Sequence, residues 1–174
     1  MKPMRTLSFR RRDSSPVRVG RSSPAAIIVA TASIALAGFA WYGHARTERR
    51  DATVTACLAA ATPAAQAIFS YDYRTFDAGV ANAQSFVTGG FVNDYATTTT
   101  NLKATAVQAQ AVVQSQVSAV GVVDASPAGI DALVYLNQYR RNVNITGEKV
   151  DQNRVVLTMV RVGGGCKVSA ASAI

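Results

Sequence analysis

An uncharged apolar run near the amino end constrains this chain more than any other feature. The run from Ala25 to Gly43 reads AAIIVATASIALAGFAWYG and holds no acidic or basic side chain over 19 residues. At about 1.5 Å per helical residue it spans roughly 28 Å, close to the hydrocarbon thickness of a bilayer. The sequence therefore predicts a single transmembrane helix over residues 25–43.

Basic residues flank this run unequally, and the imbalance predicts its orientation. Residues 1–24 contain seven Lys and Arg side chains, whereas residues 44–50 contain three. Because basic flanks are retained on the cytoplasmic side, we expect the amino end inside the cell membrane and the rest of the chain outside. Trp41 and Tyr42 stand at the outer end, where amphipathic rings favour the interface. His44, the one histidine, is interpreted as a further interfacial residue.

A cleaved signal peptide is the competing interpretation of the same run. Residues 35–37, Ala-Leu-Ala, resemble a small-residue cleavage site. The apolar run continues beyond them through Phe39 and Trp41, so we favour an uncleaved anchor. The polar, cationic composition of residues 1–24, rich in serine, predicts a disordered cytoplasmic tail.

The net charge of +8 at pH 7 belongs to the flanks of the apolar run. Residues 51–174 hold eight basic and eight acidic side chains and are therefore neutral overall. A neutral domain lacks the basic footprint that a nucleic-acid backbone requires. We therefore expect membrane and protein partners and no nucleic acid.

Beyond residue 50 the apolar side chains first follow a helical period. A first helix is expected around Leu58–Phe69, with Pro63 marking either a kink or a new start. Thr75 is placed as the N-cap of a second helix, which Gly89 and Gly90 end. Its inward positions are expected to be Phe76, Val80, Ala83 and Val87.

A third helix and then an alternating pattern follow. The third helix is expected to carry Phe91, Tyr95 and Leu102 inward, although the four threonines at 97–100 are poor helix formers. Apolar residues alternate with glutamines from Val107 to Ser118, which predicts a half-buried strand. Further apolar runs bounded by turn residues cover Ile130–Tyr139, Val155–Val162 and Cys166–Ala170.

Helices followed by antiparallel strands predict an α+β fold, with the helices packed on one face of a curved sheet. The cone-shaped cystatin-like fold has this order of elements. The predicted organisation is a tail over residues 1–24, a transmembrane helix over 25–43 and an extracytoplasmic domain over 44–174.

Four stretches carry a resemblance to a known family: SYDYRTFDAGVANAQSFVTGGF, AVGVVDAS, VYLNQYRRN and VDQNRVVLTMVRVGG. Together they resemble the Mce-associated membrane proteins of actinobacteria, accessory subunits of mammalian-cell-entry (Mce) lipid importers. The resemblance covers about Leu58 to Val168 and implies a cystatin-like outer domain. It also implies importer subunits or other envelope proteins as partners. Cys166 stands where such proteins usually place a tryptophan.

The stretch beginning at Ser70 brings charged and aromatic side chains together. Asp72, Arg74 and Asp77 are interpreted as one structural ion network, with helix-start carboxylates favoured by the helix dipole. The alternative is an acid-base site of the kind that cone-shaped domains hold in their cavity. Tyr71, Tyr73 and Tyr95 are interpreted as packing residues and not as a ligand cage.

The two cysteines, Cys57 and Cys166, both fall on the side of the membrane where disulfides persist. Two interpretations stay open: a bridge from the first helix to the last strand, or two buried thiols. Neither metal-ligand spacing nor a phosphate-binding loop is found in the sequence, so no metal or cofactor is expected.

These features predict a non-catalytic, membrane-anchored accessory or scaffold subunit, and only the resemblance names the Mce-type lipid importer. The alternative is an extracytoplasmic lipid-binding or isomerase-like domain that uses the hollow between helices and sheet. In that alternative Asp72 or Asp77 would lie at the mouth of the hollow.

Overall fold

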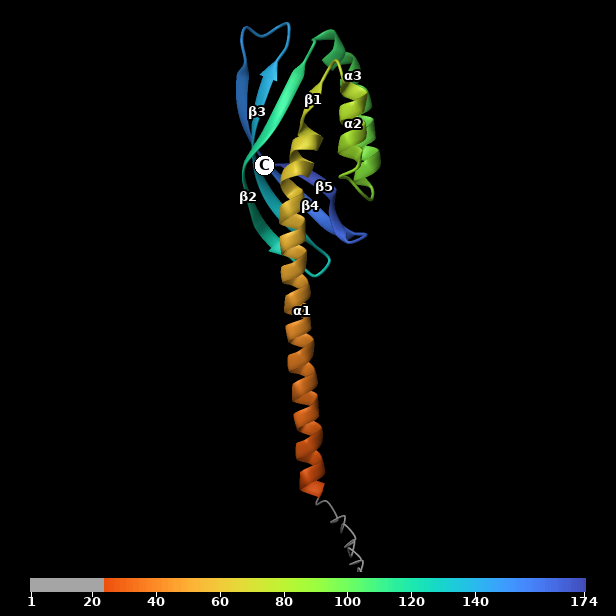
Figure 1. Cartoon of the computed structure of the whole chain (residues 1–174), viewed down its shortest axis with the longest axis vertical. Coiled ribbons are helices and arrows are strands. Elements are labelled where there is room, and N and C mark those ends of the chain that lie inside the picture. Colours follow the sequence, from red (N-terminus) through yellow and green to blue (C-terminus); the bar gives the residue numbers. More distant parts are fainter. Residues whose placement is uncertain (1–23) are drawn as a thin grey trace, which may run out of the picture. The chain divides into compact units, whose positions relative to one another are not determined.

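The computed structural model describes residues 24–174, and their side chains from Ile28 onward (Figure 1). The tail predicted over residues 1–24 lies outside the described residues except for Pro24. Residues Tyr42–Ile174 form one compact unit, called here the globular domain. The elements in chain order are α1 (Pro24–Phe69), β1 (Tyr71–Asp72), α2 (Phe76–Gln84), α3 (Phe91–Gln108), β2 (Val112–Ala125), β3 (Gly129–Arg141), β4 (Lys149–Val162) and β5 (Gly165–Ala173).

The first helix, α1, is longer than either of the two helices that the sequence predicts. The span and the helix around Leu58–Phe69 were expected as separate elements, but α1 joins them in 46 residues. Pro63 lies inside α1 and does not end it. Its neighbours Ala61, Ala64 and Ala65 are buried against the sheet, and this packing maintains the helix despite the missing backbone donor. Among the described residues, α1 is the helix long and apolar enough to cross a membrane.

The second helix, α2, is shorter than predicted. It begins after Thr75, but the Thr75 side chain makes no capping hydrogen bond, and the helix ends at Gln84 and not at Gly89. Val87 is buried for another reason: it forms a parallel bridge with Val168 of β5. The amide of Thr88 donates to the Val168 carbonyl at 2.9 Å, so pairing with the sheet ends the helix early.

The third helix, α3, begins at Phe91 and includes the threonine run. The Thr99 hydroxyl donates to the Tyr95 carbonyl at 2.8 Å and the Thr100 hydroxyl to the Ala96 carbonyl at 2.7 Å. These bonds satisfy the hydroxyl groups within the helix. The predicted third helix is therefore confirmed.

The predicted strand over Val107–Ser118 begins too early. Residues 107 and 108 belong to α3, and β2 starts at Val112. Gln110 takes a left-handed conformation with φ of 48°, and the Ala111 amide donates to the Ala106 carbonyl at 2.8 Å. This is the geometry of a Schellman helix end.

The sheet is antiparallel throughout, in the order β1-β2-β3-β4-β5, and the predicted α+β class is confirmed. The two-residue strand β1 was not predicted. Register shifts interrupt the β2–β3 pairing at Val117/Ala119 and Val122/Asp124, and such bulges bend and twist a strand. Gly163 and Gly164 both have positive φ, which the tight β4–β5 turn requires.

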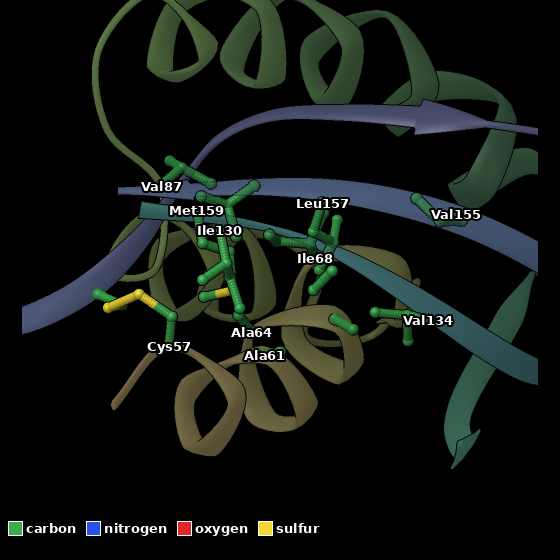
Figure 2. Close-up of a cluster of buried hydrophobic side chains, with 14 of the residues drawn as sticks. Cys57, Ala61, Ala64, Ile68, Val87, Ile130, Val134, Val155, Leu157 and Met159 are labelled. Carbon is green, nitrogen blue, oxygen red and sulfur yellow. A yellow bond between two sulfur atoms is a disulfide. The ribbon is translucent and has the colours of Figure 1, made fainter. Parts of the chain in front are cut away.

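The core lies between the globular-domain part of α1 and one face of the sheet. Figure 2 shows Cys57, Ala61, Ala64 and Ile68 of α1 beside Leu157 and Met159 of β4. Small residues on α1 allow the helix to approach the strands closely, and larger side chains on the strands fill the space. The fully buried strand residues include Ala132, Val134, Leu157, Met159 and Val168.

A buried serine holds the carboxyl end of α1 on the sheet. The Ser115 hydroxyl of β2 donates to the Phe69 carbonyl at 2.7 Å, and the Ser115 amide donates to the Ser70 hydroxyl at 2.9 Å. Gln138 of β3 donates to the Ser115 hydroxyl at 3.2 Å. The carbonyl at the end of α1 thus has a side-chain partner in place of water.

Candidate functional site

Asp72 and Arg74 form a forked ion pair beside β1. The Arg74 Nε lies 2.9 Å from Asp72 Oδ1 and its Nη2 lies 2.5 Å from Oδ2, while the Arg74 amide donates to Oδ1 at 2.9 Å. The Arg74 side chain, followed by its backbone amide, lowers the pKa of Asp72 from 3.8 to about 2. A carboxylate held in this way stays ionised at neutral pH and is a poor proton acceptor.

Asp77 does not join this pair, so the predicted single network of Asp72, Arg74 and Asp77 is wrong. Asp77 lies in the first turn of α2, and its carboxylate accepts from the Lys103 ammonium of α3 at 2.7 Å. Its side chain is 78% exposed. The predicted network is therefore replaced by two separate ion pairs, one within the β1 turn and one between α2 and α3.

The three tyrosines of this region lie in different surroundings. Tyr71 packs on Phe76 with ring centroids 5.8 Å apart, and Tyr95 packs on Phe91 at 6.3 Å. Burial raises the pKa of both Tyr71 and Tyr95. Tyr73 instead lies under the Arg74 guanidinium, 5.8 Å from its ring centroid. The tyrosines therefore serve separate packing contacts and do not surround one ligand.

A groove of about 640 Å³ opens between the end of α1, the β1 turn, α2 and the start of β2. Asp72 and Arg74 stand on its wall, and Arg141 of β3 was not anticipated there from the sequence. Arg141 is already paired with Glu148 at 3.5 Å. The lining of the groove also includes Pro63, Ala67, Gly79, Phe86 and Val113. The groove lies beside the core described above, and none of that core's buried side chains lines it.

The structure joins Cys57 of α1 to Cys166 of β5 in a disulfide, with Cα atoms 5.1 Å apart (Figure 2). Both residues are buried. Of the two interpretations left open by the sequence, the structure contains the bridge. It connects the helix to the strand at the far edge of the sheet.

The remaining candidates do not form a metal or catalytic cluster. His44 is exposed and lies 3.1 Å from Glu48, one helical turn further along α1. Within the described residues no three His, Cys, Asp or Glu side chains gather in an arrangement that would hold a metal ion.

The Asp72–Arg74 pair predicts a specific pH dependence of stability. Because the folded pKa of Asp72 is depressed, the pair stabilises the fold above pH 4 or so, and this stabilisation is lost as the pH falls towards about 2. Its size is that of a surface ion pair, below about 1 kcal/mol. Wild type and Asp72→Asn are therefore expected to differ in unfolding free energy near pH 6 and to converge near pH 2. A difference that persists unchanged at the low pH would contradict this assignment.

Comparison with known proteins identifies the fold. No family model matches the chain, and no curated protein matches its sequence. An IcmL-like type IV secretion system protein from Legionella pneumophila is similar in structure, with a TM-score of 0.56 and 15% identity over 67% of this chain and 88% of that one. The periplasmic domain of DotI is also similar, with a TM-score of 0.55 and 16% identity over 69% and 94% of the two chains. At these identities the likeness establishes the shared fold alone.

Proposed function

We propose that this chain is a non-catalytic accessory subunit of a multi-protein complex in the cell envelope, held in the membrane by a single span with its globular domain outside. The observation that carries the proposal is one helix, α1, that contains an apolar span and continues into the core of the globular domain. An anchor of this kind confines the domain to the membrane plane and raises its effective concentration near other membrane proteins. Modest contacts are then sufficient for assembly.

Two further observations support an envelope role. One protein of the same fold is named as a type IV secretion system protein, and the other as a periplasmic domain. Exposed apolar side chains on the sheet, including Val122, Val123 and Val150, provide small patches for protein contacts. The sequence resemblance to Mce-associated proteins leads us to propose an Mce-type lipid importer as the complex.

The lipid-binding or isomerase-like alternative is favoured by one feature, the groove of about 640 Å³ with Asp72 on its wall. The ionisation states argue against proton-transfer chemistry there. Asp72 is held ionised by Arg74, and Asp77 is exposed and paired with Lys103. A general acid at neutral pH requires a raised pKa and a buried position; the pKa of Asp72 is lowered instead, and Asp77 is not buried.

Gene deletion with complementation tests the proposal. Deletion is expected to lower both lipid uptake and the abundance of the importer subunits, and the full chain is expected to restore both. A secreted version of residues 44–174 without the span is expected to restore neither, because confinement is lost. An Asp72→Asn variant with the span intact is expected to restore both.

Two outcomes would contradict the proposal. Unchanged uptake and subunit abundance, together with loss of a small-molecule conversion, would favour the enzyme alternative. Failure of Asp72→Asn to complement, with normal amounts of the variant in the membrane, would assign this carboxylate a chemical role. A chain with the span replaced by an unrelated transmembrane helix serves as the control for anchoring alone.

A further inference from the structure

A second hollow, of about 330 Å³, lies where α1 passes the β2–β3 hairpin, and Figure 1 shows this hairpin beside the helix. The hairpin is fixed to its neighbours: the Thr53 hydroxyl of α1 lies 3.1 Å from the Pro127 carbonyl, and the Arg161 amide of β4 donates to the Ala128 carbonyl at 3.0 Å. The wall of the hollow is therefore held in place. It is lined by Gly43, Arg46, Thr47, Arg50, Ala125, Ser126 and Pro127.

The charge of this hollow is entirely positive. Arg46 and Arg50 line it from successive turns of α1, and no acidic residue does. Neither arginine forms an ion pair within the described part of the chain, whereas Arg74, Arg140 and Arg141 each do. Like charges four residues apart on a helix destabilise it, and an anion between them would reverse that effect. A guanidinium group presents a fork of donors that matches two oxygens of a phosphate.

The neutral groups of the hollow provide walls and not further donors. The Ser126 hydroxyl bonds to the Gly129 carbonyl at 3.2 Å, and it also accepts from the amides of Ala128 and Gly129. The Thr47 hydroxyl lies 3.1 Å from the Gly43 carbonyl of its own helix. Recognition therefore depends on the two guanidinium groups, which favours a charged phosphate over a neutral sugar or glycerol group.

The position of the hollow along α1 indicates where that phosphate comes from. Gly43, the last residue of the predicted span, itself lines the hollow. At about 1.5 Å per residue, Arg46 and Arg50 stand roughly 4.5 and 10 Å further along the helix. The headgroup layer on each side of a bilayer is about 5 to 8 Å thick. The backbone of Arg46 therefore lies within the headgroup layer, and that of Arg50 lies about 2 to 5 Å beyond it. The long Arg50 side chain spans this difference, because a helix directs its side chains back towards its amino end.

We propose that this hollow binds the phosphate of an anionic phospholipid in the leaflet from which α1 emerges, with Arg46 and Arg50 as its ligands. The inference rests on the membrane anchor proposed above and is independent of which complex the chain serves. Bound lipid would fix the depth and rotation of the helix at the membrane surface. Lipid binding would also explain why basic residues follow the span on its outer side, where such residues are disfavoured.

The test uses the full-length chain in lipid nanodiscs that contain equal parts of phosphatidylglycerol and phosphatidylcholine. Native mass spectrometry after mild delipidation measures which lipid each variant retains. Wild type is expected to retain phosphatidylglycerol in preference. Arg46→Gln and Arg50→Gln are each expected to lower that retention about tenfold, the loss of one charge-assisted contact. Arg49→Gln makes the same charge change on the same turn but outside the hollow, and it is expected to retain the lipid as wild type does.

Other results would overturn the proposal. Equal losses in all three glutamine variants would mean diffuse attraction to the surface, and equal retention of both lipids by wild type would mean no site. Sodium phosphate forms a separate arm: if it displaces phosphatidylglycerol completely, the site belongs to a soluble anion and not to a lipid. Arg50→Lys keeps the positive charge but not the forked pair of donors. It is expected to lower phosphatidylglycerol retention less than Arg50→Gln does. Circular dichroism confirms that each variant is folded.

Discussion

Removing the disulfide between Cys57 and Cys166 is expected to lower the free energy of unfolding of the globular domain by about 4 to 5 kcal/mol. The bridge closes a loop with a sequence separation of 109 residues, so its loss frees a long segment of the unfolded chain. It also joins the part of α1 that packs on the sheet to the edge strand β5. A loss of this size approaches the whole stability of an ordinary domain.

The measurement is chemical denaturation of the full chain in detergent micelles, followed by circular dichroism. The variant replaces both cysteines by alanine, because a serine hydroxyl at these buried positions would add its own cost. Wild type treated with reductant is the matched control and is expected to lose a similar amount, whereas reductant should leave the double variant unchanged. If both thiols of the untreated chain react with an alkylating reagent, the bridge is absent from the protein.

The disulfide also marks a limit of prediction from the sequence. Composition and compartment indicated that Cys57 and Cys166 were able to pair, but nothing local to either residue shows that they meet. Their pairing depends on how α1 crosses the sheet, which follows from the contacts of Ala61, Ala64 and Ile68 with the strands. Long-range packing of this kind leaves no periodic signal near the cysteines themselves.

Local signals predicted local structure well. The uncharged run, the third helix and the strand from Ile130 all follow from spacing of apolar side chains over one element. The strand predicted from Val155 begins earlier, at Lys149, because its first residues are mostly polar and carry no apolar alternation. The pairing of Asp72 with Arg74 was also predictable from the sequence, because the two residues are only two positions apart.

Errors arose where tertiary contacts overrode a local pattern. Val87 continues the helical period of α2, yet pairing with Val168 of β5 places it on the sheet. Val107 continues the apolar alternation of β2 in the sequence, yet it belongs to α3, where its side chain is 46% exposed. The helix ends only three residues later, at the left-handed Gln110. Asp77 was grouped with its sequence neighbours, but its partner, Lys103, is 26 residues away.

In the candidate sites too, local features were predictable from the sequence and long-range contacts were not. The sequence shows that three basic residues follow the span, but it does not show that Arg46 and Arg50 line a hollow. The hairpin that forms the other wall of this hollow lies 75 or more residues further along the chain. Arg141 reaches the other groove from the end of β3. Such sites are set by the register of a sheet, which apolar alternation alone does not specify to the single residue.

Gly129, the first residue of β3, is a glycine for a reason other than turn conformation. It ends the stretch DASPAG, residues 124–129, at the β2–β3 hairpin, but it is not among the described residues with positive φ. Its requirement is space: a Cβ added there would lie 2.1 Å from the Met159 carbonyl oxygen and 3.1 Å from the Cα of Val160. Both are backbone atoms of β4, which pairs with Gly129 through Val160 and has no flexible side-chain end to move aside.

Gly129→Ala is therefore expected to destabilise the globular domain by about 3 kcal/mol, the upper end of the usual cost of overpacking. Relief of the contact requires β3 to move away from β4 where Ile130 and Met159 are buried, so core packing is lost together with ladder hydrogen bonds. Gly121→Ala on the neighbouring strand is the matched control, because nothing lies within 4 Å of its added Cβ. That control is expected to change stability by less than about 0.5 kcal/mol. Denaturation of both variants in the full chain measures the difference, and equal stabilities would show that β3 and β4 are not in the close contact that the structure describes.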